Sequence, residues 1–256
     1  MSTLDVARSD RVLTLTIVRP AQLNALSDEQ ADALAAELET AASYDDVRVV
    51  VLRGAGRAFC AGADIAGADV PLQLDVRALD RANRIVRAIT RLDKPVVAAV
   101  HGPAAGVGCS IALACDLAVA AESASFLLAF ARIGLMPDGG SSASVAASIG
   151  RARAMRMALL AEPLSGREAY DAGLVSHLAG GDTFEAVLAD VVSRLAAGAP
   201  LAQAATKRAV NAATYAGLDD ALERERTSQT LLLRTRDAAE GMQAFAERRT
   251  PDFEGE

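Results

Sequence analysis

The amino-acid sequence predicts an α/β fold, in which helices pack on a mostly parallel β-sheet and a helical region follows at the C-terminal end. Two observations support this prediction. As far as Thr183, short apolar segments typical of strands alternate with longer segments whose apolar residues repeat at helical spacing. Beyond Thr183 almost every segment has a helical pattern. Because no change of composition precedes Pro200, we expect one core domain over residues 1–199 and a helical C-terminal region over residues 200–256.

The first predicted elements are a strand and a helix. Residues 12–18 alternate apolar and polar side chains, which is typical of a half-buried strand. Ser27 and Gln30 have the spacing of a capping box, so a helix is expected to begin there and to run to about Tyr44. The apolar residues that recur at helical spacing within it are Leu34, Ala35, Leu38 and Ala41.

The middle of the chain alternates in the same way. The β-branched run at residues 47–52 predicts a buried strand, and a loop of small residues follows over residues 58–68. Residues 75–92 carry apolar side chains on one helical face, and Lys94-Pro95 ends that helix. Residues 96–100 then predict a second buried strand.

The elements that follow are short. Strands are predicted over residues 117–120 and around Phe126, and helices over residues 109–114, 142–148, 151–160 and 165–172. Gly173 suits the position after the last of these helices, and Pro200 suits the first turn of a later one.

Composition excludes several classes of protein. A hydrophobic fraction of 52% excludes a disordered chain, and apolar runs are too short for the ~20 residues of a membrane helix. A net charge of −7 with no Trp gives no support for a nucleic-acid surface. The N-terminus lacks the apolar stretch of a signal peptide, so we expect a cytoplasmic protein without a membrane partner. We expect buried thiols, and neither disulfides nor a metal site, at Cys60, Cys109 and Cys115.

Two glycine-rich turns are candidates for a ligand site. One spans residues 60–64 and follows a predicted buried strand, and the other spans residues 102–108 between a strand and a helix. Both lack the Lys-Ser/Thr of a phosphate loop. Small residues allow a ligand to approach backbone N–H groups, so the two turns could direct two amides at one oxygen. Tight packing of the turns explains the same residues equally well.

Asp138 is the candidate acid or base. It follows Pro137, precedes two glycines and lies next to an apolar run, and such surroundings raise the pKa of a carboxyl group towards neutrality. An Asp before two glycines also suits the cap of a following helix, and both interpretations stay open on the residues alone.

Other polar residues are weaker candidates. Ser110 lies one residue short of a Gly-x-Ser-x-Gly elbow, because Ala112 replaces the last glycine. Neither His101 nor His177 is placed to activate it, and Asp116 is expected to be structural.

Four motifs in order resemble the enoyl-CoA hydratase/isomerase (crotonase) family, over residues 5–255. They are Arg19-Pro20 with Asn24-Ala25-Leu26, residues 58–64, residues 100–108 with 113–116, and Ala172-Gly173-Leu174-Val175. The resemblance implies a spiral of ββα units whose C-terminal helices build a homotrimer or a dimer of trimers. It also implies that an acyl-CoA thioester binds and that the backbone amides of Ala63 and Val107 hold its enolate.

The sequence departs from the family's hydratases at two positions. Those enzymes carry one glutamate where this chain has Ser110 and a Pro-Glu pair where it has Ala129-Phe130. Residues 126–140 and 150–155 instead resemble the epoxyphenylacetyl-CoA isomerases of phenylacetate breakdown and related Δ3,Δ2-enoyl-CoA isomerases, which use an acid at the position of Asp138. The resemblance therefore favours an isomerase. The alternatives are a hydratase with other acid/base groups, a non-catalytic acyl-CoA carrier and a hydrolase that uses Ser110.

The resemblance also implies a binding surface, with no cofactor beyond the CoA of the substrate. CoA is expected to contact Arg19, Ala61, Asp64, Ile65, Lys207 and Arg248, with Arg249 as a further basic candidate. The acyl group is expected to contact Phe126, Leu127, Phe130 and Ile133, although Phe130 suits the core equally.

Overall fold

The computed structural model describes residues 4–65 and 76–256. Its centre is a six-stranded sheet of order β1-β2-β3-β4-β6-β9, parallel throughout except that β1 runs antiparallel to β2. The strands are β1 (Leu4–Ser9), β2 (Val12–Ile17), β3 (Val49–Gly54), β4 (Val96–Val100), β6 (Leu117–Ala121) and β9 (His177–Ala179). A second sheet has the order β5-β7-β8, with β5 (Pro103–Ala105), β7 (Ser125–Leu127) and β8 (Leu164–Ser165).

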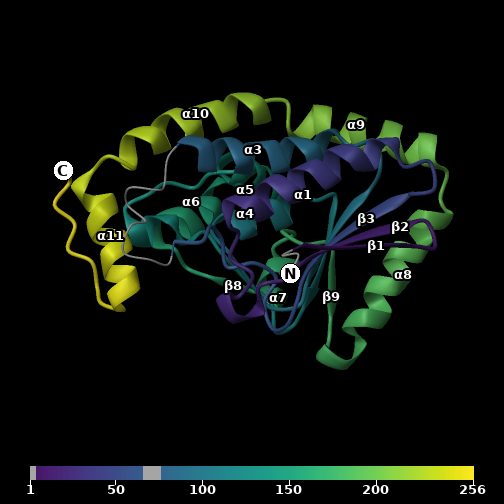
Figure 1. Ribbon diagram of the computed structural model, residues 1–256, viewed down its shortest axis with the longest axis horizontal. Coiled ribbons are helices and arrows are strands. Elements are labelled where there is room, and N and C mark those ends of the chain that lie inside the picture. The colour runs from purple at the N-terminus through teal and green to yellow at the C-terminus, as the bar shows by residue number, and fades with distance from the viewer. Residues whose placement is uncertain (1–3, 66–75) are drawn as a thin grey trace.

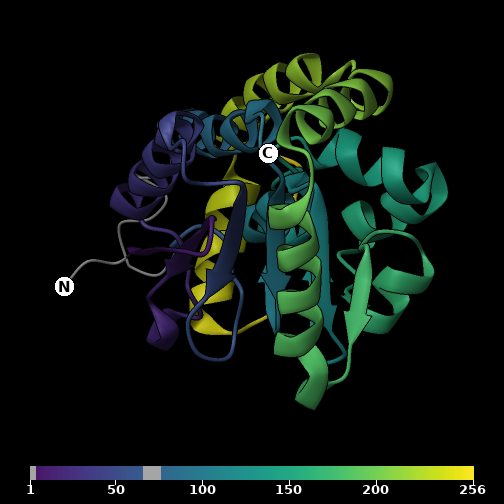
Figure 2. The ribbon, with the colours of Figure 1, turned by 90° about the vertical axis from the view of Figure 1, so that its right-hand side faces the viewer.

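The central strands β3, β4 and β6 of the large sheet are buried on both faces, to which their successive side chains point in turn. On β3, Val50 and Leu52 join the main core, whereas Val49 and Val51 join a smaller cluster with Phe184 of α8 (Phe184–Ala197). The main core lies under α1 (Asp28–Thr40), α3 (Val76–Arg91) and α4 (Val107–Ala114). Figure 2 shows α8 running alongside the strands. The continuous apolar runs of β3 and β4 follow from this double burial.

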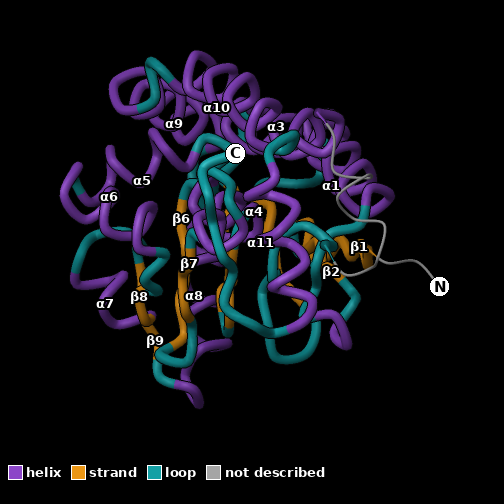
Figure 3. Tube along the Cα trace, turned by 90° about the vertical axis from the view of Figure 1, so that its left-hand side faces the viewer, coloured by secondary structure: helices purple, strands orange, loops and turns teal. Residues whose placement is uncertain are grey.

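The part of the chain that follows β7 is mostly helical. Besides α8, its helices are α5 (Ser141–Ile149), α6 (Arg151–Leu160), α7 (Gly166–Asp171), α9 (Pro200–Thr214), α10 (Leu218–Leu232) and α11 (Arg236–Glu247). Figures 1 and 3 show α3, α9 and α10 as one helical layer over the strands. Helix α11 then turns back onto the 3₁₀ turn Ala129–Ile133. Leu218 and Leu222 of α10 belong to the main core, so the C-terminal region packs on the same core as the rest of the chain.

Most predicted elements are present, and the exceptions have local causes. β1 was not predicted, because only Leu4 of its six residues is buried and its sequence lacks the alternation of a half-buried strand. β5 falls inside the predicted glycine turn, and β8 lies at the start of a predicted helix. Residues 66–68 of the predicted loop and residue 75 of the predicted helix lie outside the described residues.

The capping box at Ser27 is confirmed: its hydroxyl accepts from the Gln30 N–H, and the Gln30 side chain accepts from the Ser27 N–H. Pro200 lies at the start of α9, as predicted. Over the described part of the chain, none of the helices combines the length and apolar character that crossing a bilayer requires.

Candidate functional site

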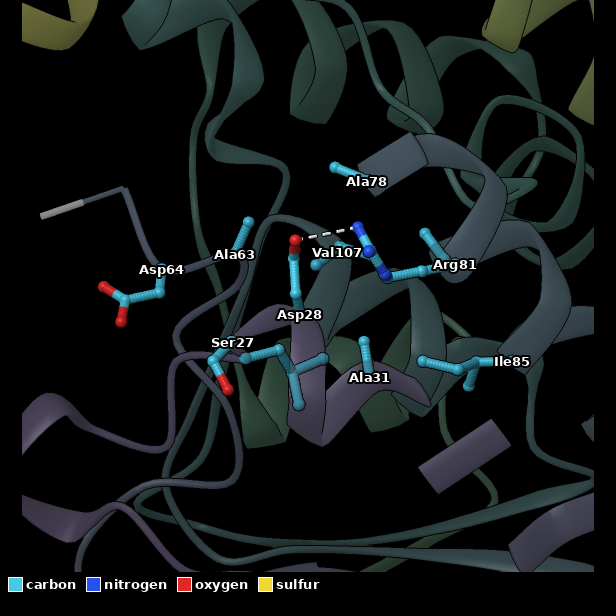
Figure 4. Close-up of a pocket in the computed structure, with 11 residues that line it drawn as sticks. Ser27, Asp28, Ala31, Ala63, Asp64, Ala78, Arg81, Ile85 and Val107 are labelled. Atoms are coloured by element: carbon cyan, nitrogen blue, oxygen red, sulfur yellow. Dashed lines mark ion pairs between the residues drawn. The ribbon is translucent and has the colours of Figure 1, made fainter. Parts of the chain in front are cut away.

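A pocket of about 200 Å³ lies between the starts of α1 and α3 and the two glycine-rich turns. Figure 4 shows Ala63, from the first turn, and Val107, from the second, among the residues that line it. An ion pair of 2.9 Å between Asp28 and Arg81 lies beside them. The apolar part of the lining comes from Leu26, Ala31, Ala78, Ala82 and Ile85. The two residues whose amides the resemblance singled out, Ala63 and Val107, therefore line one cavity.

The N–H groups of Ala63 and Val107 are available to a ligand. Ala63 lies opposite Leu26 in a parallel β-bridge, but the hydrogen bonds of that bridge do not use the Ala63 N–H. Leu26 N–H donates to Gly62 O at 2.8 Å, and Asp64 N–H donates to Leu26 O at 2.9 Å. Val107 is the first residue of α4, so its N–H has no acceptor within the helix. Within residues 4–65 and 76–256 neither N–H has a hydrogen-bond partner.

Glycines allow the two turns to meet. Gly62 has a φ of +107°, and a Cβ there would come within 3.0 Å of the carbonyl oxygen of Ala105. Gly106, with φ +52° and ψ −132°, adopts a conformation that side chains rarely allow. Two backbone hydrogen bonds between Cys60 and residues of β5 join the turns: Cys60 N–H donates to Pro103 O, and Ala105 N–H donates to Cys60 O.

Asp138 has the surroundings that its sequence predicts. Its side chain is buried, with 7% of the residue exposed, and burial raises its pKa to about 7. A hydrogen bond from Gln229 lowers the pKa, and the negative charge of Glu225 raises it further. Oδ2 accepts from Gln229 Nε2 at 3.2 Å. In the described part of the chain, Oδ1 has no hydrogen-bond partner.

The segment that carries Asp138 packs on α4. Its backbone oxygen accepts from the hydroxyls of Ser110 and Ser141, each at 2.8 Å. A Cβ on Gly139 would lie 2.9 Å from Ser110 Cβ and 3.8 Å from Val107 Cγ2. Asp138 does not line the pocket of Figure 4. Its neighbour Gly139 packs against α4 near Val107, and Val107 does line the pocket.

The alternative role of Asp138 as a helix cap is wrong. Helix α5 begins after Gly140 without a side-chain cap from Asp138. Glu225 of α10 satisfies that helix end instead, because its carboxylate accepts from Gly140 N–H at 2.7 Å and from Ser142 N–H at 3.0 Å.

Glu225 and Gln229 are site residues that the sequence analysis missed. Both are 1% exposed and come from α10, far along the chain from Asp138. A signal was present: Leu218, Leu222, Glu225 and Gln229 follow one another at helical spacing, so the two polar residues continue an apolar stripe.

Four of the predicted CoA contacts gather near Ala63. Arg19 pairs with Asp64 at 2.7 Å and donates to the carbonyl oxygen of Ala25 at 2.8 Å. Ala61 N–H donates to Leu23 O, and Ile65 packs against a small apolar cluster on α11. Arg248, at the end of α11, is exposed, whereas Arg249 forms ion pairs with Glu240 and Glu247.

The assignment of Lys207 to CoA binding is wrong. Its side chain is buried, and its ammonium donates to Ile89 O at 2.8 Å, Lys94 O at 3.1 Å and Asp116 Oδ2 at 2.7 Å. These bonds use all three donors inside the chain, so none remains for a phosphate. Asp116, which also accepts from Val96 N–H, is structural as expected.

The predicted acyl contacts divide into two groups. Phe126 is fully buried in the main core, so its assignment to a pocket is wrong. Phe130 is also a core residue, which agrees with the second of its two interpretations. Leu127 and Ile133 are half-buried, and Ile133 packs against α11. None of the four lines the pocket of Figure 4.

A hydrolase that uses Ser110 finds no support. The Ser110 hydroxyl donates to the backbone of Asp138, while His101 is hydrogen-bonded to Gly56 O and His177 to Ser176. Burial raises the pKa of Cys60 and Cys109 to about 12, so these thiols stay protonated at neutral pH. The described residues contain no group of three metal-ligating side chains.

Comparisons with known proteins agree with the motifs. A family model described as enoyl-CoA hydratase/isomerase matches residues 7–256. The 2,3-dehydroadipyl-CoA hydratase of Escherichia coli (strain K12) is 38% identical over 258 residues, which cover 100% of both chains. The 1,2-epoxyphenylacetyl-CoA isomerase of the same organism is also 38% identical, over 249 residues and 95% of each chain.

A solved structure confirms the predicted crotonase-like α/β fold with its helical C-terminal region. The crystal structure of an enoyl-CoA hydratase from Mycobacterium avium subsp. paratuberculosis K-10 superimposes with a TM-score of 0.91 at 50% identity and covers 99% of each chain. With the family model matched over nearly the whole sequence, this chain belongs to the enoyl-CoA hydratase/isomerase family.

Proposed function

We propose that this enzyme is an enoyl-CoA isomerase that moves a carbon–carbon double bond of an acyl-CoA thioester, with Asp138 as its acid/base. The observation that carries the proposal is the Asp138 carboxyl group, which is buried and whose Oδ1 has no hydrogen-bond partner among the described residues, while the adjacent Gly139 packs on the helix that begins at Val107. A carboxyl group with a pKa of about 7 can both accept and return a proton near neutral pH.

The amides of Ala63 and Val107 would form the oxyanion hole. Both residues line one pocket, and neither N–H has a hydrogen-bond partner in the described part of the chain, which supports a role for the two N–H groups as joint donors to the thioester oxygen. As negative charge develops on that oxygen, each donor contributes about 3 kcal/mol to transition-state stabilisation. Electron withdrawal into the oxygen also makes the α-carbon more acidic.

Asp138 would then move one proton. It removes the proton from the α-carbon, and the two amides hold the dienolate that results. The same carboxyl group returns the proton two carbons further along, which brings the double bond into conjugation with the thioester. One carboxylate is sufficient, because no water has to be activated.

Hydration is the second candidate activity. It is favoured by the equal identity of the chain to a hydratase and to an isomerase. Against it, Ser110 and Ala129-Phe130 offer no carboxylate at the two positions where the family's hydratases have glutamate. Glu225, the other buried acid near Asp138, already accepts two backbone N–H groups, which argues against its activating a water molecule.

Binding and assembly complete the proposal. CoA would lie along Arg19, Ala61, Asp64 and Ile65, with Arg248 contributing charge, and no separate cofactor is needed. A homotrimer or dimer of trimers is supported by large apolar side chains that stay exposed on the helices: Leu159, Leu160, Leu201, Leu231 and Phe245. We propose a cytoplasmic location, which suits the three free cysteines Cys60, Cys109 and Cys115.

The test is the activity of Asp138→Asn on a 3-enoyl-CoA, followed by the appearance of conjugated absorbance. We expect kcat/KM to fall by about 10²–10⁴-fold, because the acid/base is lost, while the affinity for the CoA ester measured by calorimetry is unchanged. The exposed Asp182→Asn serves as the control and should keep wild-type activity. Full isomerase activity in Asp138→Asn would refute the role of Asp138. Rapid wild-type hydration of a 2-enoyl-CoA, with little isomerisation, would favour the hydratase.

A further inference from the structure

The two oxygens of the Asp138 carboxyl group have different surroundings. Oδ2 accepts a hydrogen bond of 3.2 Å from Gln229 Nε2, whereas Oδ1 has no partner among the described residues. The residue is 7% exposed, so the difference is not averaged by bulk water. A proton on this carboxyl group can therefore occupy either of two oxygens with different hydrogen-bond surroundings.

The orientation of the Gln229 amide is fixed by the backbone of Met136. Its Oε1 accepts from Met136 N–H at 3.0 Å, and its Nε2 donates to Met136 O at 2.9 Å. One hydrogen of the Nε2 group is used on Met136, and the other is left for Asp138 Oδ2. Flipping the amide would break both bonds to Met136, so Gln229 presents only a donor to Asp138.

From this arrangement we infer that Gln229 is a positioning residue, which reserves Oδ2 as an acceptor and assigns the transferable proton to Oδ1. A proton on Oδ2 would face the hydrogen of Gln229 Nε2, whereas a proton on Oδ1 meets no donor. The inference rests on the proposed role of Asp138 as the acid/base. It adds the atom that exchanges the proton and the residue that selects it.

Glu225 acts on the same loop from one helical turn earlier. It accepts from Gly140 N–H and Ser142 N–H, so α10 holds the loop on both sides of Asp138. Its negative charge raises the pKa of Asp138, whereas the Gln229 hydrogen bond lowers it, and these are the two side chains of the described residues that act on this group. Removing each should therefore shift the titration of Asp138 in opposite directions.

The test compares Gln229→Met with the wild-type protein. In Gln229→Met we expect the acidic limb of the pH profile of kcat/KM to move upward by about one pH unit, because the ionised carboxylate loses its hydrogen bond. Infrared difference spectra, with Asp138→Asn as the reference that lacks the band, should show the same upward shift of the Asp138 carboxyl group. In Glu225→Gln we expect a downward shift. Gln229→Glu keeps an acceptor for Met136 N–H but adds a negative charge, so its shift should be upward and larger.

The matched control is Gln203→Met on α9, a half-buried glutamine that donates to Leu195 O and lies outside the site. It should leave the pH profile unchanged. A wild-type titration midpoint in folded Gln229→Met or Gln229→Glu would overturn the inference. So would an upward shift in Glu225→Gln, because loosening of the loop would then explain both variants.

The spectroscopic measurement separates this inference from the proposed function. If the Asp138 band shifts in Gln229→Met but Asp138→Asn still isomerises 3-enoyl-CoA, Gln229 still sets the titration of Asp138, whereas the isomerase mechanism fails and the transfer of a proton from Oδ1 fails with it. If Asp138→Asn is inactive and the band does not move, the mechanism stands and the inference fails.

Discussion

At the scale of single residues, Asp138 shows how a carboxyl group is kept near its point of titration. Burial removes the water that would stabilise the carboxylate, and Glu225 adds repulsion, while Gln229 supplies one compensating hydrogen bond. The balance gives a pKa of about 7, well above the ordinary value of 3.8. Ionisation of this group in the folded protein is therefore costly, and that cost should be measurable as stability.

We predict that Asp138→Asn stabilises the fold at alkaline pH. A carboxyl group whose pKa is raised by folding contributes fully to stability below its unfolded pKa, and that contribution is lost as pH rises through the folded value of about 7. The advantage of the Asn variant should thus be smallest near pH 4 and grow to at most about 4 kcal/mol by pH 8. Urea unfolding across this pH range measures it. A difference that is independent of pH would contradict the raised pKa.

The residues predicted from the sequence are those whose signal is local. Asp138 and the two glycine-rich turns lie in segments whose composition is unusual on its own, and the resemblance to the family then pointed to Ala63 and Val107 within those turns. Gln229 reaches Asp138 across 91 positions, and nothing near Asp138 in the sequence indicates that contact. Lys207 was misassigned because a lysine in a helical sequence is usually exposed, and only the packing of α9 shows that its ammonium is buried.

At the scale of elements, glycines allow the two glycine-rich turns to lie against each other. Gly62 Cα lies close to the second turn, since a Cβ on Gly106 would come within 3.8 Å of it. Gly108, one residue into α4 from Val107, approaches the first turn so closely that a Cβ would lie 2.4 Å from Cys60 O. The small residues of these turns predicted them from the sequence, but β5, inside the second turn, was not predicted because its three residues resemble a loop.

We predict that Gly62→Ala lowers kcat by about 10²-fold while the protein stays folded. The added methyl group would meet Ala105 O at 3.0 Å in a backbone with φ +107°, so the turn must shift and carry the Ala63 N–H with it. Loss of one oxyanion donor costs about this factor. Steady-state kinetics and circular dichroism test the two statements.

Gly173→Ala provides the comparison for Gly62→Ala. Gly173 also has a positive φ, +79°, but a Cβ there meets nothing within 4 Å. It should cost about 1 kcal/mol of stability from backbone strain and leave kcat unchanged. An equal loss of kcat in both variants would mean that general strain, and not the position of the Ala63 amide, is responsible.

At the scale of the whole molecule, Lys207 joins the C-terminal helices to the core. Its ammonium on α9 bonds to the last turn of α3 at Ile89, to the residue that precedes Pro95 and to Asp116 at the start of β6. The Asp116 carboxylate then accepts from Val96 N–H on β4. Burial raises the pKa of Asp116, and the charge of Lys207 lowers it. The Lys207 side chain thus links the C-terminal helical region, predicted to begin at residue 200, to three segments of the core.

We predict that Lys207→Met destabilises the protein by about 2–3 kcal/mol, because the Asp116 carboxylate, whose side chain is 20% exposed, loses its counter-charge and the hydrogen bond from the ammonium. The loss should be smaller at acidic pH, where Asp116 can be protonated, and chemical denaturation across pH measures it. The double variant Lys207→Met with Asp116→Asn should recover part of the loss, since the Asn oxygen still accepts from Val96 N–H and no unpaired carboxylate remains. The KM for an acyl-CoA, measured where each variant is folded, should stay at the wild-type value. A tenfold rise in KM with unchanged stability would instead return Lys207 to the CoA site.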